Sequence, residues 1–171
     1  MPLSKHICLL GFMGAGKSTL GAALAERLNV SWIDSDLWIE QNQQQSIQDI
    51  IIAVGWPAFR ALEHEFTLSM ASQKPSVISC GGGFPLAQEN WHWVSEHCTS
   101  IYLRVDSEHL YERLSLNQGS RPLIANLNQE SLKLFITSEL KHREPIYERA
   151  DFIVNGNGTA EETISLMETL I

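Results

Sequence analysis

The sequence has 171 residues, of which 44% are apolar and 19% charged, and these proportions exclude a disordered or fibrous chain. Twelve Lys and Arg against twenty Asp and Glu give a formal net charge of −8, which argues against a broad electrostatic surface for nucleic acid or anionic lipid. A chain of this length buries roughly two thirds of its unfolded surface, enough for one core without disulfide or metal cross-links. We therefore expect a single domain over residues 1–171.

The cysteines and the N-terminal segment bear on localisation. Cys8, Cys80 and Cys98 are odd in number and scattered, so they do not form a disulfide framework. A reducing cytoplasm is the simplest interpretation. The apolar run over residues 7–13 is interrupted by Gly11 and is too short for a membrane span or secretion signal. We expect a cytoplasmic protein that associates with neither membranes nor nucleic acid.

Short apolar runs alternate with longer segments of helical periodicity, which predicts an α/β sandwich with buried parallel strands. The predicted strands are His6–Leu10, Ser31–Ile33, Ser76–Cys80, Ser100–Val105 and Asp151–Val154. Apolar residues spaced by three or four predict the helices. One predicted helix begins near Lys17 and another after Pro57. A third lies around Leu132–Leu140, and the last spans Thr159–Ile171.

A phosphate-binding signature lies between the first strand and the first helix. Residues 11–18 read Gly-Phe-Met-Gly-Ala-Gly-Lys-Ser and match G-x-x-x-x-G-K-[ST] in the strand-to-helix context that the motif requires. The glycines let backbone N–H groups turn inward around phosphate oxygens, and the helix N-terminus adds its positive dipole end. Lys17 is expected to reach the β and γ phosphates, and the Ser18 hydroxyl to ligate Mg²⁺. The predicted ATP-binding residues are Gly14, Ala15, Gly16, Lys17, Ser18 and Thr19.

The loop does not name a reaction, because switches, motors and small-molecule kinases share it. No asparagine is followed by Lys, so the N-K-x-D type guanine reader of GTPases is absent. The third predicted strand leads into Gly81-Gly82-Gly83 and lacks the terminal Asp that many P-loop ATPases place at the metal. The polar stretch over residues 117–128 is typical of a lid. Of these three classes, the features therefore favour a small-molecule kinase with a lid.

Two acidic residues follow the second predicted strand, in Asp34-Ser35-Asp36, at the end where open α/β sheets place their chemistry. In extended chain their side chains would point the same way, so that one faces a metal and its water and the other an acceptor hydroxyl. Alternatively, one of them caps the following helix. The three glycines at 81–83 are equally ambiguous, as a tight turn or as consecutive N–H donors.

Taken together, these residues resemble the shikimate kinase family over nearly the whole chain. Beyond the phosphate loop, the resemblance rests on Asp34-Ser35-Asp36, Phe59-Arg60-x-x-Glu63, Gly81-Gly82-Gly83, Arg121-Pro122-Leu123, and Arg143-x-Pro145-x-Tyr147 leading into Ala150-Asp151. It implies a P-loop kinase fold: a three-layer α/β sandwich with a five-stranded parallel sheet. It also implies a mobile lid over about residues 112–128 and a substrate-binding helical region over about 35–62.

The resemblance implies that ATP phosphorylates the 3-hydroxyl of shikimate, giving shikimate 3-phosphate and ADP in the chorismate pathway of aromatic amino-acid biosynthesis. Asp36 would orient or deprotonate that hydroxyl. Lys17 would act with Arg121, which would close over the phosphates as the lid shuts. Asp34, together with Ser18, would hold Mg²⁺.

The resemblance also implies a substrate site in which two guanidinium groups bind a planar carboxylate. Its predicted residues are Asp36, Arg60, Gly81, Gly82, Gly83 and Arg143. Glu63, on the same helix face as Arg60, would orient it. Arg113 would stack on adenine as a cation over the ring. The expected partners are ATP and shikimate, and the expected state is a monomer.

One residue departs from the family pattern, and two rival functions stay open. Gly55 is followed by Trp56 where the family often has Glu, and the indole would either pack or wall the substrate pocket. The first rival is another small-molecule kinase of this fold, for gluconate or nucleotides. The second is a non-catalytic nucleotide-binding regulatory module, which the intact Lys17, Asp36 and Arg143 disfavour.

Overall fold

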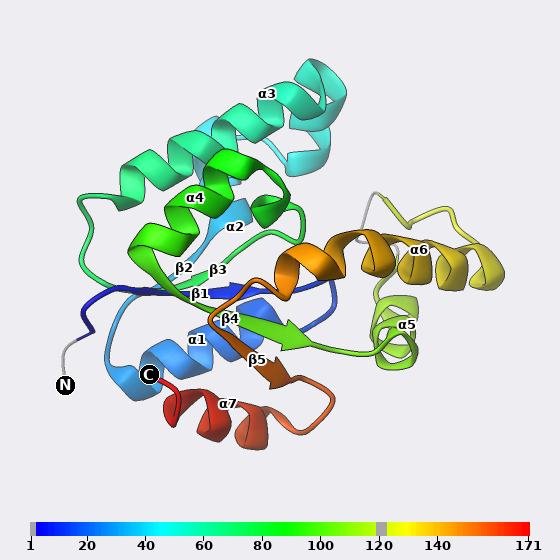
Figure 1. The fold of residues 1–171 in the computed structure, drawn as a ribbon. Coiled ribbons are helices and arrows are strands. Elements are labelled where there is room, and N and C mark those ends of the chain that lie inside the picture. Colours follow the sequence, from blue (N-terminus) through cyan, green and yellow to red (C-terminus); the bar gives the residue numbers. More distant parts are fainter. Residues whose placement is uncertain (1–2, 119–122) are drawn as a thin grey trace.

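The strands form one parallel sheet at the centre of the molecule (Figure 1). The computed structural model describes residues 3–118 and 123–171, and its sheet has the order β2-β3-β1-β4-β5, with every neighbouring pair parallel. The strands are β1 His6–Leu10, β2 Trp32–Asp34, β3 Val77–Ser79, β4 Cys98–Arg104 and β5 Phe152–Asn155. All five residues of β1 are buried, as a central strand covered on both faces requires. The five predicted strands are confirmed, with ends displaced by one or two residues.

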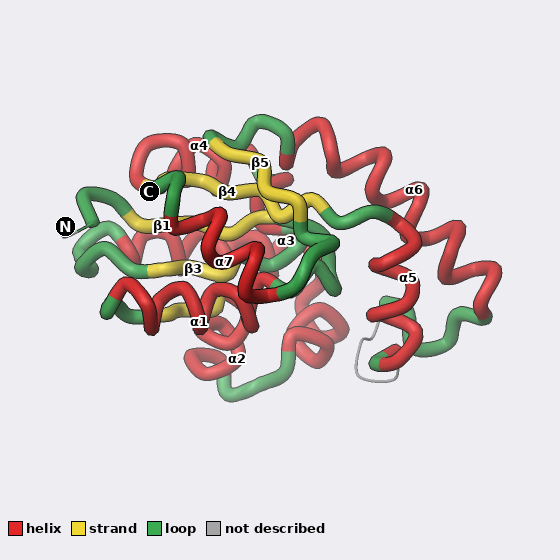
Figure 2. The backbone as a smooth tube through the Cα atoms, turned by 90° about the horizontal axis from the view of Figure 1, so that it is seen from below, coloured by secondary structure: helices red, strands yellow, loops and turns green. Residues whose placement is uncertain are grey.

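The helices cover both faces of the sheet and also extend past one end of it. They are α1 Lys17–Leu28, α2 Ser35–Gln43, α3 Ile47–Met70, α4 Gln88–His97, α5 Ser107–Leu116, α6 Gln129–Tyr147 and α7 Ala160–Glu168, with a 3₁₀ turn η1 Phe84–Leu86. Figure 1 shows α1 and α7 on one face of the sheet and α3 and α4 on the other, which confirms the expected three layers. In Figures 1 and 2, α5 and the first part of α6 lie beyond the carboxyl ends of the strands.

The region between β2 and β3 is more helical than the sequence pattern predicted. The apolar periodicity predicted a helix after Pro57, and the resemblance implied a helical region from about residue 35. The structure has α2 from Ser35 and α3 from Ile47. Ser46 caps α3, since its Oγ accepts a hydrogen bond from the Asp49 N–H at 3.1 Å. Between α2 and α3 lies a small core of their own, made by Ile39, Ile50 and Phe59. This segment corresponds to the predicted substrate-binding region over about 35–62.

The three cysteines are free, buried thiols. The Sγ of Cys8, in β1, lies 3.2 Å from that of Cys98 and 3.7 Å from that of Cys80. The register pairs Cys8 with Ser100 and with Ile78, so each neighbouring cysteine is displaced by two residues along its strand and the three thiols form a diagonal row. Burial raises the pKa of the Cys8 thiol, which disfavours the reactive thiolate. The thiols therefore act as packing groups.

Within residues 3–118 and 123–171, no helix is long and apolar enough to cross a membrane.

A close contact between α1 and the sheet depends on Gly21. Beneath it, the Trp32 Nε1–H donates to Ser79 Oγ at 3.0 Å, and the Ser79 hydroxyl donates to the Lys17 carbonyl at 2.8 Å. A Cβ on Gly21 would overlap Ser79 Oγ and lie 3.0 Å from Trp32 Nε1. Because α1 begins at Lys17, at the end of the phosphate-binding segment, the missing side chain fixes how closely Lys17 approaches the strands.

We expect Gly21→Ala to destabilise the protein by about 1–3 kcal/mol, although Ala in an exposed helix is favoured over Gly by about 1 kcal/mol. The added methyl group must displace Ser79 or move α1. Urea denaturation measures the change. The matched control is Gly158→Ala, whose nearest neighbour is the exposed carboxylate of Glu162 at 3.1 Å, and it should change stability by less than about 0.5 kcal/mol. Equal effects of the two substitutions would contradict the packing argument.

Candidate active site

The phosphate loop connects β1 to α1 and has the predicted form. Gly14 and Gly16 have φ values of 82° and 94°, where a side chain would be strained. Gly16 is the N-cap of α1, so the positive end of the helix faces the loop. The Lys17 Nζ donates to the carbonyl oxygens of Gly11 and Phe12, at 2.8 and 2.9 Å. The loop thus combines backbone donors, a helix N-terminus and an ammonium group, which suits a phosphate chain. The predicted ATP-binding residues lie in the loop (Gly14, Ala15, Gly16) or in the first turn of α1 (Lys17, Ser18, Thr19).

Asp34 caps the following helix, which was one of the two alternatives that the sequence left open. Its Oδ1 accepts hydrogen bonds from the Asp36 N–H at 3.0 Å and the Leu37 N–H at 3.2 Å, so it caps α2. Its Oδ2 accepts a hydrogen bond from the Ser18 hydroxyl at 2.7 Å. The capping corrects one expectation: Asp36 is not in extended chain, but in the first turn of α2.

Ser18 and Asp34 also fit a divalent cation. A hydroxyl and a carboxylate oxygen at hydrogen-bond distance are hard donors of the kind that Mg²⁺ prefers. In phosphotransfer enzymes this ion keeps several waters and uses few protein ligands together with phosphate oxygens. The pair lies directly beside the phosphate loop, because Ser18 follows Lys17 in α1.

The Asp36 carboxylate lies against the backbone that follows β3. A Cβ on Gly81 would come within 2.5 Å of Asp36 Oδ1. The pKa of Asp36 is raised to about 6, chiefly by desolvation and next by the charge of Asp34, although Lys17 lowers it. A carboxylate whose pKa lies near the working pH is well suited to accept a proton from a hydroxyl group.

The glycine run 81–83 is required for space rather than for an unusual turn. The positive-φ glycines among the described residues are Gly11, Gly14, Gly16 and Gly55, so the run has ordinary backbone angles. Each of its α-carbons instead contacts a predicted site residue. A Cβ on Gly81 would meet the Asp36 carboxylate. A Cβ on Gly82 would lie 3.6 Å from Arg143 Nη1, and one on Gly83 would lie 2.5 Å from Arg60 Nη2. A Cβ at Gly81 or Gly83 would displace Asp36 or Arg60, whereas a Cβ at Gly82 would make an ordinary van der Waals contact with Arg143.

One predicted donor of this run has a partner within the protein. The Gly81 N–H donates to the Ser35 Oγ at 2.9 Å, so in this structure it supports the β2–α2 junction. Ser35 is fully buried and connects the end of β2 to the end of β3. The donor role of Gly82 and Gly83 toward a substrate stays a prediction.

Arg60 is held by its own helix. Its Nη1 donates to Glu63 Oε1 and Oε2 at 2.7 and 2.6 Å, which confirms that Glu63 orients it. Glu63 is only 1% exposed, and burial raises its pKa to about 7 despite the pairing with Arg60. The Asn90 amide, from α4, adds a hydrogen bond to Glu63 at 3.4 Å. The rings of Trp56 and Phe59 lie beside the guanidinium, with centroids 5.3 and 5.6 Å from Cζ.

Arg143, from α6, approaches the same glycine run from the other side. Its Nε and Nη2 donate to Glu139 Oε2 at 3.0 and 2.6 Å, and its Cζ lies 5.4 Å from the centroid of the Phe12 ring. The Tyr147 hydroxyl, one turn later in α6, donates to the Gly82 carbonyl at 2.5 Å. The structure therefore brings Arg143, Arg60 and the Asp36 carboxylate to one stretch of backbone, as the resemblance implied.

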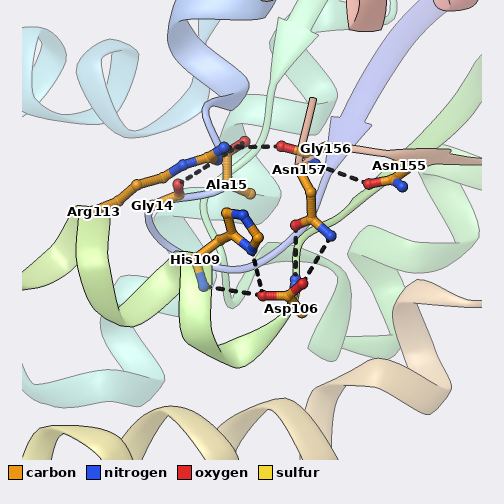
Figure 3. A network of polar contacts seen from close by, with 8 residues as sticks. All are labelled: Gly14, Ala15, Asp106, His109, Arg113, Asn155, Gly156 and Asn157. Carbon is orange, nitrogen blue, oxygen red and sulfur yellow. Dashed lines mark hydrogen bonds and ion pairs between the residues drawn. The ribbon is translucent and has the colours of Figure 1, made fainter. Parts of the chain in front are cut away.

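Arg113 ties together two loops at the opposite end of the phosphate loop (Figure 3). Its Nη1 donates to the carbonyl oxygens of Gly14 and Ala15 at 3.3 and 3.4 Å, and its Nη2 to that of Gly156 at 2.9 Å. These carbonyls face away from the side where phosphate would be bound by N–H groups. The predicted stacking on adenine stays a prediction, and the contacts here show Arg113 as a brace for the phosphate loop.

The loop after β5 is fixed to α5 by a second set of contacts in Figure 3. Asp106 caps α5 by accepting a hydrogen bond from the His109 N–H at 3.0 Å. Asn157 binds Asp106 twice: its Nδ2 donates to Oδ2 at 2.9 Å, and its Oδ1 accepts from the Asp106 N–H at 3.2 Å. The loop after β5 is thus joined to the start of α5.

The predicted lid falls partly on residues that the structure describes. Residues 112–116 of the expected range belong to α5. On the far side, Ile124 is fully buried, and the Gln118 side chain donates to its carbonyl at 2.6 Å. Arg121 lies outside the described residues, so its closure over the phosphates stays a prediction.

Sequence reasoning missed several residues that support the site. The supporting role of Ser35 was not predicted, because only the two carboxylates of Asp34-Ser35-Asp36 were considered. Tyr147 belongs to the motif Arg143-x-Pro145-x-Tyr147. Its spacing of four residues from Arg143 places it on the same helix face, and that spacing was the available signal. Asn90 and its helix α4 gave no clear signal, because the periodicity of Gln88–His97 is interrupted by polar residues.

A glycine-rich phosphate loop at the carboxyl edge of a parallel sheet, a carboxylate with a raised pKa and two oriented guanidinium groups define a P-loop kinase that acts on a small molecule. The sequence matches the model of the shikimate kinase family over residues 13–170. The chain belongs to the shikimate kinase family.

Individual relatives agree with this assignment. The chain is 38% identical to a shikimate kinase of Rippkaea orientalis over 162 residues, 94% of this chain and 84% of that protein. Its fold resembles the crystal structure of a shikimate kinase from Bacteroides thetaiotaomicron, with a TM-score of 0.92, 32% identity and 97% of each chain covered. A shikimate kinase from Acinetobacter baumannii in complex with shikimate gives a TM-score of 0.89 at 30% identity, covering 97% of this chain and 92% of that one.

We expect Asp36→Asn to stabilise the folded protein near neutral pH. Because the folded-state pKa is raised from 3.8 to about 6, the folded protein retains a proton that the unfolded chain loses between these values. Stability therefore falls as pH rises through this range. The neutral amide avoids that loss. The free energy of unfolding of the variant should exceed that of the wild type by about 1–2 kcal/mol at pH 8, and the difference should shrink toward pH 4.5.

Thermal and urea denaturation across this pH range measure the difference. The control is Glu65→Gln, an exposed acid on α3, which should show no such pH-dependent gain. A gain for Asp36→Asn that is the same at both ends of the range would contradict the desolvation argument.

Proposed function

We propose that this protein transfers the γ-phosphoryl group of ATP to the 3-hydroxyl of shikimate, giving shikimate 3-phosphate and ADP. The observation that carries this proposal is the convergence of Arg60, Arg143 and Asp36 on the glycine run 81–83. Two guanidinium groups suit a planar carboxylate, and a carboxylate with a raised pKa suits the activation of a hydroxyl group. Membership of the shikimate kinase family and the shikimate complex of one structural relative support the same acceptor.

The residues divide the work of an in-line transfer. Asp36 accepts a hydrogen bond from the acceptor hydroxyl, orients its oxygen and takes its proton as the new P–O bond forms. Arg60 and Arg143 bind the acceptor carboxylate and so fix the distance of that oxygen from the phosphate loop. The loop N–H groups and Lys17 stabilise the charge that spreads over the phosphate oxygens and the departing ADP.

We propose Mg²⁺ as the divalent cation, held by Ser18 and Asp34. When bound, it neutralises charge on the β and γ phosphates. The hydrogen bond between these two residues pre-orients both oxygens before the cation and nucleotide enter. We also propose that the enzyme is a monomer that acts in the cytoplasm, with Arg121 and the lid completing the site over the phosphates.

The geometry also bears on the rivals. A nucleotide kinase would need a pocket for a second base, whereas the two guanidinium groups here suit a small acid. Gluconate is also a small hydroxylated acid, so the arginine residues alone do not exclude it. A non-catalytic module has no use for a carboxylate near Gly81 whose pKa lies near neutrality.

The decisive experiment is a coupled assay for ADP release by the purified full chain with Mg²⁺-ATP, across shikimate, gluconate and nucleoside monophosphates. We expect turnover with shikimate at a kcat/KM at least a hundredfold above that for the other acceptors, as expected for a site built to bind specific polar groups. Turnover with another acceptor and none with shikimate would contradict the proposal. Binding of ATP with no turnover of any acceptor would favour the regulatory module.

Arg143→Ala should raise the KM for shikimate about 10- to 100-fold, which is the range for losing a charge-assisted pair of hydrogen bonds. The KM for ATP should change little, because Arg143 faces the glycine run. The matched control is Arg149→Ala: Arg149 stacks on Trp91 at 4.4 Å, and its removal should leave the KM for shikimate unchanged. An unchanged KM for shikimate in Arg143→Ala would remove this residue from the acceptor site.

A further inference from the structure

Trp56 is placed by a break in the longest helix. Within α3, Gly55 has φ 77° and ψ 172°, a conformation that glycine adopts readily and other residues do not. Pro57 is tolerated because it lies in the first turn of the helix that restarts there. Arg60 then follows Trp56 by four residues, on the same side of the restarted helix. The break therefore sets an indole ring beside a guanidinium group of the acceptor site.

The contacts of Trp56 differ from those of a core residue. Its ring meets the Phe59 ring edge to face, with centroids 5.9 Å apart and an interplanar angle of 80°. Phe59 is 4% exposed, whereas Trp56 is 42% exposed. The buried ring thus anchors the indole at its edge, while the indole keeps its centroid 5.3 Å from Arg60 Cζ, within the range of a cation–π contact.

An aromatic ring can hold a guanidinium group without neutralising it. Glu63 already binds Nη1 of Arg60 through both of its carboxylate oxygens. A second acid at position 56 would offer another carboxylate to the same cation, in competition with the carboxylate of an acceptor. The indole attracts the cation through its ring quadrupole and brings no charge. Nη2, which lies over Gly83, keeps its positive charge for the acceptor.

The other arginine of the site is held in the same manner. Arg143 has one acid on its own helix, Glu139, and its Cζ lies 5.4 Å from the centroid of the Phe12 ring. Each guanidinium thus combines a single carboxylate partner on its own helix with uncharged aromatic neighbours, which are Trp56 and Phe59 for Arg60 and Phe12 for Arg143. This parallel indicates that Trp56 belongs to the support of the site and not only to the packing of α3.

We propose that Trp56 is a positioning residue for the acceptor: its indole holds the Arg60 guanidinium over Gly83 and thereby strengthens the binding of acceptors that carry a carboxylate. This inference rests on the proposed function, because it takes Arg60 as one of the two groups that bind the acceptor carboxylate. Trp56 acts through Arg60 and does not touch the reacting atoms.

The test compares Trp56→Phe, which keeps an aromatic ring, with Trp56→Leu, which keeps apolar bulk without one. Steady-state kinetics of the full chain are measured with shikimate and with its methyl ester, which lacks the negative charge. We expect Trp56→Leu to lower kcat/KM for shikimate about three- to tenfold through KM, with kcat and the KM for ATP within about twofold. The effect on the methyl ester should be less than about twofold, and Trp56→Phe should retain most of the affinity.

A double-mutant cycle shows whether Trp56 acts through Arg60. In an Arg60→Ala background, Trp56→Leu should change kcat/KM by less than about twofold. Leu68→Ala is the control for loss of apolar contact on the same helix, since Leu68 is 63% exposed, and it should leave the kinetics unchanged. Thermal denaturation of each variant checks that the fold is kept.

The possible results separate this inference from the proposed function. If the wild-type chain does not phosphorylate shikimate, the proposed function fails. If it does, any of three results overturns the role of Trp56: an unchanged KM in Trp56→Leu, an equal loss with the methyl ester, or an equal loss in the Arg60→Ala background. A Trp56→Phe variant as weak as Trp56→Leu would likewise exclude the aromatic contact.

Discussion

The site depends on the close approach of charged side chains to the backbone of Gly81–Gly83. This run follows β3, which lies between β1 and β2 in the sheet, so it is flanked by the phosphate loop on one side and by the start of α2 on the other. Helices from three parts of the chain bring Asp36, Arg60 and Arg143 onto it. Since a Cβ at Gly81 or Gly83 would overlap Asp36 or Arg60, the absence of side chains at these two positions sets how closely both charged groups approach the backbone.

Electrostatics in this region opposes the stability of the ligand-free protein. Asp36 and Glu63 both have raised pKa values, of about 6 and 7, with desolvation as the first cause. Two partly or fully buried acids held near neutrality lower the stability of the folded protein as the pH rises through this range. Arg60 and Asn90 already bind Glu63, whereas an acceptor hydroxyl would give the Asp36 carboxylate a hydrogen-bond donor. In the proposed function, the stability lost at Asp36 serves proton transfer, and the buried Glu63 carboxylate orients Arg60.

The sequence predicted best those features that only a few residue types can provide. The phosphate loop, the five strands, and the pairing of Arg60 with Glu63 followed from spacing and chemistry. Local geometry was less predictable: the sequence left open whether Asp36 is extended or lies at the start of a helix, and capping by Asp34 starts the helix at Ser35. Contacts across the chain, such as that of the Tyr147 hydroxyl with the Gly82 carbonyl, depend on the tertiary arrangement, because helical spacing places Tyr147 on the face of Arg143 but does not predict its partner.

A protein with a net charge of −8 can bind anionic ligands because of how the arginine residues of its site are held. Arg60 and Arg143 each have one acid on their own helix, at i+3 and i−4, and an aromatic ring beside the guanidinium. A single acid fixes the orientation of a guanidinium group, but a second would compete with the substrate carboxylate. Aromatic rings supply the remaining support without charge. An acidic protein can therefore keep two cationic side chains beside Asp36, provided that each guanidinium group is paired with a single acid on its own helix.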